Sequence, residues 1–192
     1  MDALIAGHPP GTMPPEFVGG LAGDGVAALR AFVQAGGTLI CLDSSGELAI
    51  DMLQLPIRDV TRDPMADQFF CPGSILRLEL DESHPLAFGM PRETSAFFSY
   101  SAAYDLERRI LTSDGHGGAP PDTSVRVVGR YPARDLLLSG WLQGESIIAN
   151  RAAVVEARSG FGRVVLIGFR AQHRAQSHAT FRLLFNAILT SK

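Results

Sequence analysis

Apolar residues recur with two different spacings in the first part of the chain, and the change of spacing marks the predicted elements. Residues 1–7, Met-Asp-Ala-Leu-Ile-Ala-Gly, have the apolar run of a short strand. Asp24 is placed to cap a helix that ends at Gly36-Gly37, and its apolar positions have helical spacing: Val26, Leu29 and Val33. Residues 38–42, Thr-Leu-Ile-Cys-Leu, are apolar throughout, as in a strand covered on both faces. Strand, helix and strand in this order predict a β-α-β unit.

A second helix is predicted directly after residues 38–42. Ser44 and Glu47 have the spacing of a capping box, in which each side chain accepts a hydrogen bond from the other residue's backbone N–H. The apolar positions that follow are Leu48, Ile50 and Met52. The helix should end before Pro56, because proline cannot continue it.

The middle of the chain is less regular. Residues 75–80 alternate between apolar and charged side chains, which predicts a half-exposed strand. A turn is expected at 83–86 and a further extended segment at 97–100. Glycine and proline crowd residues 114–121, and this composition predicts an exposed loop between two strands of one domain.

The last third of the chain predicts three strands and a helix. The strands fall at residues 125–128, 152–156 and 163–167, and the turn Ser-Gly-Phe-Gly at 159–162 suits a hairpin between the last two. The sheet is therefore expected to have an antiparallel extension. The terminal helix carries an apolar stripe that should pack back on the sheet: Phe181, Leu184, Phe185 and Ile188.

Length and the absence of repeats favour a single domain over residues 1–192. A hydrophobic content of 46% suffices for a buried core, and no second core or internal repeat is evident. Because an apolar strand at the second residue would normally follow other elements of a sheet, we expect the sequence to be a fragment of a longer chain.

Charge and hydropathy exclude two classes of partner. The 17 basic and 20 acidic residues are spread along the sequence and give a net charge of −3, so no basic stripe predicts nucleic-acid binding. The longest apolar runs are far shorter than the roughly 20 residues that cross a bilayer, so we expect a soluble domain with no membrane span. Cys41 and Cys71 are too few for a disulfide framework; one bridge between them stays open. Cys41, inside an apolar strand, is expected to be inert packing.

The segment after residues 38–42 is a candidate site, because ligands of open α/β sheets gather at the carboxyl ends of strands. Ser44 and Ser45 resemble the strand-to-helix elbow of hydrolases, yet Leu42 occupies the first glycine position and only Gly46 fits. Capping of a helix by Ser44 explains the same residues. The alternative is a serine hydrolase in which Ser44 is the nucleophile, His173 the base, and Glu47 or Asp43 orients the imidazole.

A second candidate site follows Gly168. Arg170, His173 and Arg174 could bind a carboxylate or another anion, because guanidinium groups form paired hydrogen bonds with such ligands. The same residues, with His178, also suit a solvated loop that enters a helix.

No metal or cofactor site is predicted in this domain. The sequence holds no H-E-x-x-H, no H-x-x-E and no paired Cys/His cluster. His84 is explained by a turn before Pro85, and His116 by a glycine loop.

Three segments together resemble class I glutamine-amidotransferase-like domains: Gly-Gly-Thr-Leu-Ile at 36–40, His-Pro-Leu-Ala-Phe-Gly-Met at 84–90, and Gly-Arg-Val-Val-Leu-Ile-Gly-Phe-Arg at 162–170. More narrowly, Leu-Ser-Gly-Trp-Leu at 138–142 and Phe-Arg-Leu-Leu-Phe-Asn-Ala at 181–187 resemble the C-terminal domain of some bacterial zinc carboxypeptidases. The resemblance covers most of the chain. It implies an α/β, flavodoxin-like sheet with flanking helices.

The resemblance also implies a role. Amidotransferases of this class carry a cysteine at the elbow and a histidine after a late strand, whereas this sequence has Ser44 or Ser45 and the step Gly168-Phe169-Arg170. His173 is displaced by three residues from the position of that imidazole. We therefore expect a non-catalytic accessory domain of a zinc carboxypeptidase. The zinc is expected in a preceding peptidase domain of the same chain, which would be the partner of this domain. A homo-oligomer is the other partner that stays open. Secreted and periplasmic locations both stay open.

Overall fold

The computed structural model describes residues 2–65, 67–106, 124–175 and 177–191. Its sheet is mixed, and its main path runs in the order β1 (Thr38–Leu42), β9 (Gly162–Ile167), β8 (Ala152–Ser159), β6 (Val125–Arg130), β3 (Ser74–Leu80) and β4 (Glu93–Phe98). Three short strands join it from the side: β2 (Ile57–Asp59), β5 (Tyr104–Leu106) and β7 (Leu137–Ser139). The loop predicted at 114–121, with His116, lies outside the described residues.

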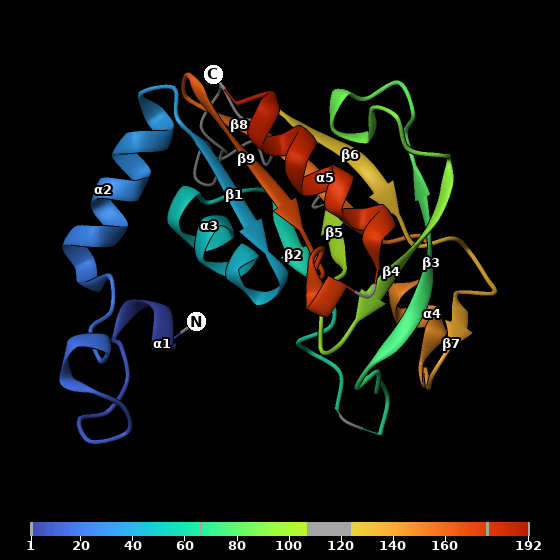
Figure 1. The fold of residues 1–192 in the computed structure, drawn as a ribbon, viewed down its shortest axis with the longest axis horizontal. Helices are drawn as coiled ribbons and strands as arrows, with labels where there is room; N and C mark the ends of the chain where they lie inside the picture. The colour runs from blue at the N-terminus through green and yellow to red at the C-terminus, as the bar shows by residue number, and fades with distance from the viewer. Residues whose placement is uncertain (1, 66, 107–123, 176, 192) are drawn as a thin grey trace, which may run out of the picture.

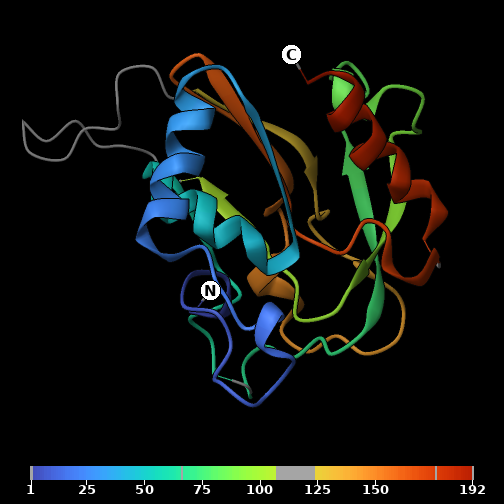
Figure 2. The same ribbon diagram turned by 60° about the vertical axis from the view of Figure 1, so that its left-hand side comes forward.

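Helices flank the curled sheet (Figures 1 and 2). They are α1 (Asp2–Ile5), α2 (Ala22–Gln34), α3 (Gly46–Leu53), α4 (Glu145–Ile148) and α5 (His178–Leu189). The fold is thus the α/β sheet with flanking helices that the sequence predicted. None of the helices in the described part of the chain is long and apolar enough to cross a bilayer.

Local sequence patterns explain the strands. β3 alternates between buried and half-buried side chains along its whole length, as the sequence predicted. β8 and β9 form the predicted antiparallel hairpin, in which Ser159 pairs with Gly162 and Gly160 takes a positive φ of 59°. β1 pairs with β9 in parallel, so the antiparallel part of the sheet extends from β9 onward.

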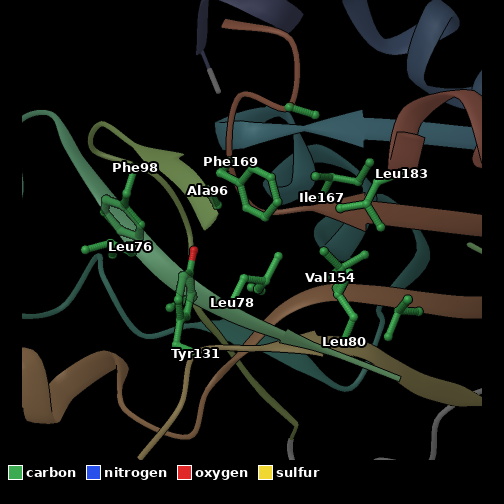
Figure 3. Packing of buried hydrophobic residues seen from close by; sticks show 14 of the residues in the cluster. Leu76, Leu78, Leu80, Ala96, Phe98, Tyr131, Val154, Ile167, Phe169 and Leu183 are labelled. Atoms are coloured by element: carbon green, nitrogen blue, oxygen red, sulfur yellow. The ribbon is translucent and has the colours of Figure 1, made fainter. Parts of the chain in front are cut away.

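Two hydrophobic clusters cover the two faces of the sheet. One lies between β3, β4, β9 and α5, and its central side chains include Leu78, Tyr131, Phe169 and Leu183 (Figure 3). The other lies under α2 and α3 and includes Val33, Met52 and Leu166. β1 touches both clusters, because Ile40 and Leu42 pack against the first and Leu39 against the second. The prediction that this strand is covered on both faces is confirmed.

Two predictions at the start of the chain are wrong. Residues 2–5 form the short helix α1 and not a strand, so the predicted β-α-β unit lacks its first strand. The helix before β1 begins at Ala22, and its cap position is Leu21, which leaves Asp24 in the first turn. An acidic side chain there still favours the helix, because it faces the positive end of the helix dipole.

The buried face of α5 also differs from the prediction. Its buried residues are Thr180, Leu183, Asn186 and Ala187, whereas Phe185 and Ile188 are more than half exposed. Two polar side chains can enter the core because their hydrogen-bonding groups are satisfied. Thr180 donates to the Ala171 carbonyl at 2.7 Å, and Asn186 donates to the carbonyls of Leu86 and Phe88 at 2.9 and 3.0 Å.

Candidate functional site

The elbow after β1 is occupied by Asp43 rather than by a serine. Asp43 has a positive φ of 55°, a conformation that non-glycine residues adopt rarely but that aspartate tolerates better than most. Its Oδ2 accepts a hydrogen bond from Arg170 Nε at 2.8 Å, which ties the end of β1 to the segment after β9. The other carboxylate oxygen, Oδ1, is buried and has no hydrogen-bond partner among the described residues.

The capping box predicted for Ser44 and Glu47 is absent. Ser45 serves the turn instead: its Oγ accepts from the Leu42 N–H at 2.9 Å and donates to the Leu42 carbonyl at 2.7 Å. Glu47 forms an ion pair with Arg62 at 2.8 Å. Ser44 makes no side-chain hydrogen bond to a described residue, and it lines a cleft.

This cleft, which we call the elbow cleft, has a volume of about 530 Å³. Small-molecule sites in proteins have volumes of this order. Segments distant in the sequence form its walls: Ser44, Asp59, Thr61, Arg62, Pro64, Phe69, Phe70, Cys71, Tyr100, Ser101 and Ala102. The cleft therefore combines aromatic surface with polar groups.

Charged side chains of the elbow cleft are held in a network. Asp59 Oδ1 accepts from the Thr61 N–H at 3.0 Å, the Thr61 hydroxyl at 2.8 Å and the Ala103 N–H at 3.2 Å. Arg62 lies between two carboxylates, at 2.8 Å from Glu47 and 3.5 Å from Asp59. Glu47 is not among the residues that line the cleft, but because it pairs with Arg62 the charge of that one guanidinium is shared between two carboxylates.

Aromatic rings stand at the outer part of the elbow cleft. Phe70 and Tyr100 meet edge to face with ring centroids 6.3 Å apart. Tyr100 is 69% exposed and has a positive φ of 51°, a strained conformation for a bulky residue. The exposed ring is available to contact a ligand.

A buried phenol lies behind the elbow. Tyr104 packs its ring and hydroxyl against Gly46, where a β-carbon would collide with the hydroxyl oxygen. The hydroxyl has no partner among the described residues, and burial raises the pKa of Tyr104 far above its usual range. The glycine after Ser45 is therefore required by the close approach of Tyr104.

The predicted anion-binding residues do not gather around the elbow cleft. His173 stacks on Phe97 of β4, with ring centroids 4.3 Å apart, and it is absent from the residues that line the cleft beside Ser44. Arg170 is paired with Asp43, which offsets its charge. Arg174 lies in an exposed turn with a positive φ of 47°. Whether these three residues bind an anion stays a prediction.

Both thiols are free and buried, so the bridge left open by the sequence does not form. Burial raises the pKa of Cys41 to about 12 and also raises the pKa of Cys71. A neutral thiol is a poor nucleophile and a poor metal ligand. The inert packing role predicted for Cys41 agrees with this.

His84 has a structural role in the turn, as the sequence predicted. Its Nδ1 accepts a hydrogen bond from the Leu86 N–H at 3.2 Å, and burial lowers the pKa of its imidazole. Nε2 lies 4.0 Å from Glu156, which is paired with Arg163 at 3.0 Å. In the described part of the chain, no three residues of the types His, Cys, Asp and Glu form a group suited to a metal ion.

Sequence reasoning missed the residues that define the elbow cleft. It found the correct strand end but centred the elbow on Ser44, one residue late. The position of Asp43 directly after the apolar run was the available signal. Arg62, Phe70 and Tyr100 belong to no sequence motif, and only the fold brings them together.

Comparison with known proteins shows the fold and no more. No family model matches the sequence, and no curated protein matches it. A putative ThuA-like protein from Parabacteroides merdae matches with a TM-score of 0.51 and 12% identity, over 89% of this chain and 66% of that protein. A β-galactosidase from Bacillus circulans sp. alkalophilus matches with a TM-score of 0.50 and 12% identity, over 87% of this chain and 20% of the enzyme.

The chain thus spans about two thirds of the ThuA-like protein and about a fifth of the β-galactosidase. At 12% identity these likenesses concern architecture alone. The chain has a flavodoxin-like α/β fold of the class I glutamine-amidotransferase type.

Proposed function

We propose that this chain is a non-catalytic accessory domain of a longer hydrolytic enzyme. One observation carries the proposal: Asp43 occupies the elbow and is held by Arg170, while His173 lies stacked on Phe97. Acyl transfer by a fold of this type requires a thiol or hydroxyl in hydrogen-bond reach of an imidazole. A carboxylate tied to a guanidinium does not supply that couple.

The occurrence of a similar fold as a fifth of a β-galactosidase chain supports an accessory role, because there the fold accompanies other parts of an enzyme. The zinc carboxypeptidase context rests on the sequence resemblance alone. Reading the coding sequence upstream for an H-x-x-E zinc motif tests it. Absence of that motif would refute the proposed peptidase partner, but it would not refute the proposed accessory role.

The absence of turnover is tested by covalent labelling. We expect a fluorophosphonate probe to label the wild-type chain no more than the Ser44→Ala variant, since no histidine is among the described residues that line the cleft beside Ser44. Denatured protein gives the background level. Labelling of the native wild type that is abolished both by Ser44→Ala and by His173→Ala would refute the proposal and establish the serine hydrolase alternative.

A second function, ligand binding in the elbow cleft, is favoured by the cleft's volume and its exposed ring. Because Glu47 and Asp59 outnumber Arg62, the ligand should be neutral or cationic, with an apolar face for Tyr100. An anion bound by Arg170, His173 and Arg174 remains the alternative.

Thermal unfolding with matched probes distinguishes the two. We expect stabilisation by neutral polyols or organic cations, by a few degrees at saturating ligand, and loss of this stabilisation in Tyr100→Ala. Phe161→Ala, at an exposed ring that does not line the elbow cleft, should keep it. Stabilisation by carboxylates alone, removed by Arg174→Ala, would favour the anion site.

A further inference from the structure

His84 lies at a buried junction between the turn at residues 84–90, the sheet and the end of α5. Its side chain is 2% exposed. Nδ1 accepts the hydrogen bond from the Leu86 N–H at 3.2 Å, so the single proton of the neutral ring is on Nε2. Nε2 has no hydrogen-bond partner among the described residues, and a carboxylate oxygen, Glu156 Oε1, lies 4.0 Å away. The neutral ring therefore leaves one buried donor unsatisfied.

Four charged side chains act on this imidazole, and their signs balance. Glu156 of β8 and Asp81, which follows β3, favour the protonated ring, whereas Arg126 of β6 and Arg163 of β9 oppose it. Glu156 is also engaged elsewhere, since its Oε2 lies 3.0 Å from Arg163 Nη1. Burial therefore decides, and it lowers the pKa of His84 below its ordinary value of 6.5. The folded chain holds the ring neutral.

The end of α5 is fastened to both sides of this junction. On the side of the turn, Asn186 donates to the carbonyls of Leu86 and Phe88 at 2.9 and 3.0 Å. On the side of the sheet, Arg163 Nη2 donates to the Ala187 carbonyl at 3.2 Å. A rearrangement of the turn, or of the ion pair between β8 and β9, would therefore act directly on the end of α5.

The geometry around His84 does not accommodate a second proton on the ring. A protonated Nδ1 is a donor, so it can no longer accept from the Leu86 N–H and instead meets that group donor to donor. To form a hydrogen bond of about 2.8 Å with Glu156, the charged ring must move by about 1 Å toward β8. Because Nδ1 and Nε2 lie on different sides of the ring, this movement takes Nδ1 away from Leu86. Two cations, the ring and Arg163, then compete for one carboxylate.

We propose that His84 is an acid-sensitive latch: protonation of its imidazole releases the turn at residues 84–90 and the end of α5, while the central strands stay paired. Release would uncover the part of the first hydrophobic cluster on which Leu183 and Ala187 pack. The inference concerns this junction alone and does not depend on the proposed function.

The pH range follows from the linkage between protonation and opening. In the opened turn the ring is exposed to water and binds a proton near its ordinary pKa of 6.5, whereas the closed turn binds it only at lower pH. The closed form therefore has its full stability above about pH 6.5 and loses stability as the pH falls below that value. One proton allows the opening equilibrium to rise by no more than about 30-fold between about pH 7 and about pH 5. The Ser83 hydroxyl lowers the pKa of Asp81, so that carboxylate keeps its charge in this range.

Hydrogen exchange of backbone amides, expressed as a protection factor at each pH, tests the proposal on the whole chain. Between about pH 7 and about pH 5 the protection of the Leu86, Ala87 and Ala187 N–H groups should fall about 10-fold or more. That of the β8 amides should change by less than about 3-fold. An equal fall in β8 would mean that the whole fold is lost, and it would overturn the proposal. Unchanged protection at all these sites would also overturn it.

The variant His84→Asn identifies the responsible group. Asparagine does not titrate, and its Oδ1 can accept from the N–H two residues later, as Nδ1 of the histidine does. The variant should therefore have the same protection at both pH values. His178→Asn, at an exposed imidazole that begins α5, should keep the wild-type response. A response that persists in His84→Asn, or that disappears in His178→Asn, would refute the proposal because another group would then be responsible.

Should His84→Asn not fold, NMR titration of the His84 ring in the wild type takes its place. The ring resonances should change over the same pH range in which the turn at residues 84–90 loses its protection. Titration of the ring while the turn stays protected would refute the latch.

Discussion

Replacing Gly162 with alanine should destabilise the domain by about 3 kcal/mol or more. A β-carbon at this position would overlap the carbonyl oxygens of Val33 and Gly37, both of which are backbone atoms that cannot move aside as a side chain could. Gly162 opens β9, and the next residue donates the Arg163–Gly37 hydrogen bond that starts the β1–β9 ladder. The clash therefore separates the end of α2 from the parallel pair of strands. Urea-induced unfolding of the variant measures the loss.

The control for this variant is Gly23→Ala. No heavy atom lies within 4 Å of the β-carbon built at Gly23, and the residue is in the exposed first turn of α2. Alanine there should stabilise the domain by about 0.5–1 kcal/mol, because it restricts the unfolded chain and favours the helix. Equal effects of the two substitutions would mean that α2 does not pack on the β8–β9 hairpin as described.

Truncation of Leu183 to alanine should cost about 2–5 kcal/mol, since the residue is 1% exposed and lies inside the cluster of Figure 3. Phe185→Ala, two residues later on the same helix, should cost about 1 kcal/mol or less, because that ring is 55% exposed. Chemical unfolding of both variants gives the difference directly. The comparison is sharp because phenylalanine is the larger side chain.

A larger loss of stability in Phe185→Ala than in Leu183→Ala would mean that α5 buries the face that the sequence predicted, and not the face that the structure shows. A conservative variant, Leu183→Met, separates the effect of packing from that of helix propensity, because methionine keeps the volume of the side chain. It should cost less than about 1.5 kcal/mol if packing at Leu183 is what α5 contributes.

Most strands could be predicted because their signal is local. The alternation in β3, the apolar run of β1 and the glycine turn between β8 and β9 each depend on a few neighbouring residues. Backbone geometry fixes these periods, so a short stretch of sequence is enough to show them. The N-terminal segment shows no such period, since an apolar run of four residues fits a strand or a helical turn equally well.

The candidate site could be predicted only in part. The end of β1 was found, because the carboxyl end of a buried strand is visible in the sequence. Arg62, Phe70 and Tyr100 could not be found, since their roles arise from the approach of separate loops. The positive φ of Asp43 likewise comes from the turn that β1 and α3 impose on it.

The sequence by itself determined the class of the fold, the positions of β1, β3, β8 and β9, and the loss of the cysteine expected at the elbow. The tertiary structure decided which face of α5 is buried, that Asp43 pairs with Arg170, and which side chains form the elbow cleft. The physical reason is that a polar side chain such as Asn186 is stable in the core only when its hydrogen-bond partners lie there. Those partners are a hundred residues away in the sequence, and only folding brings them within reach.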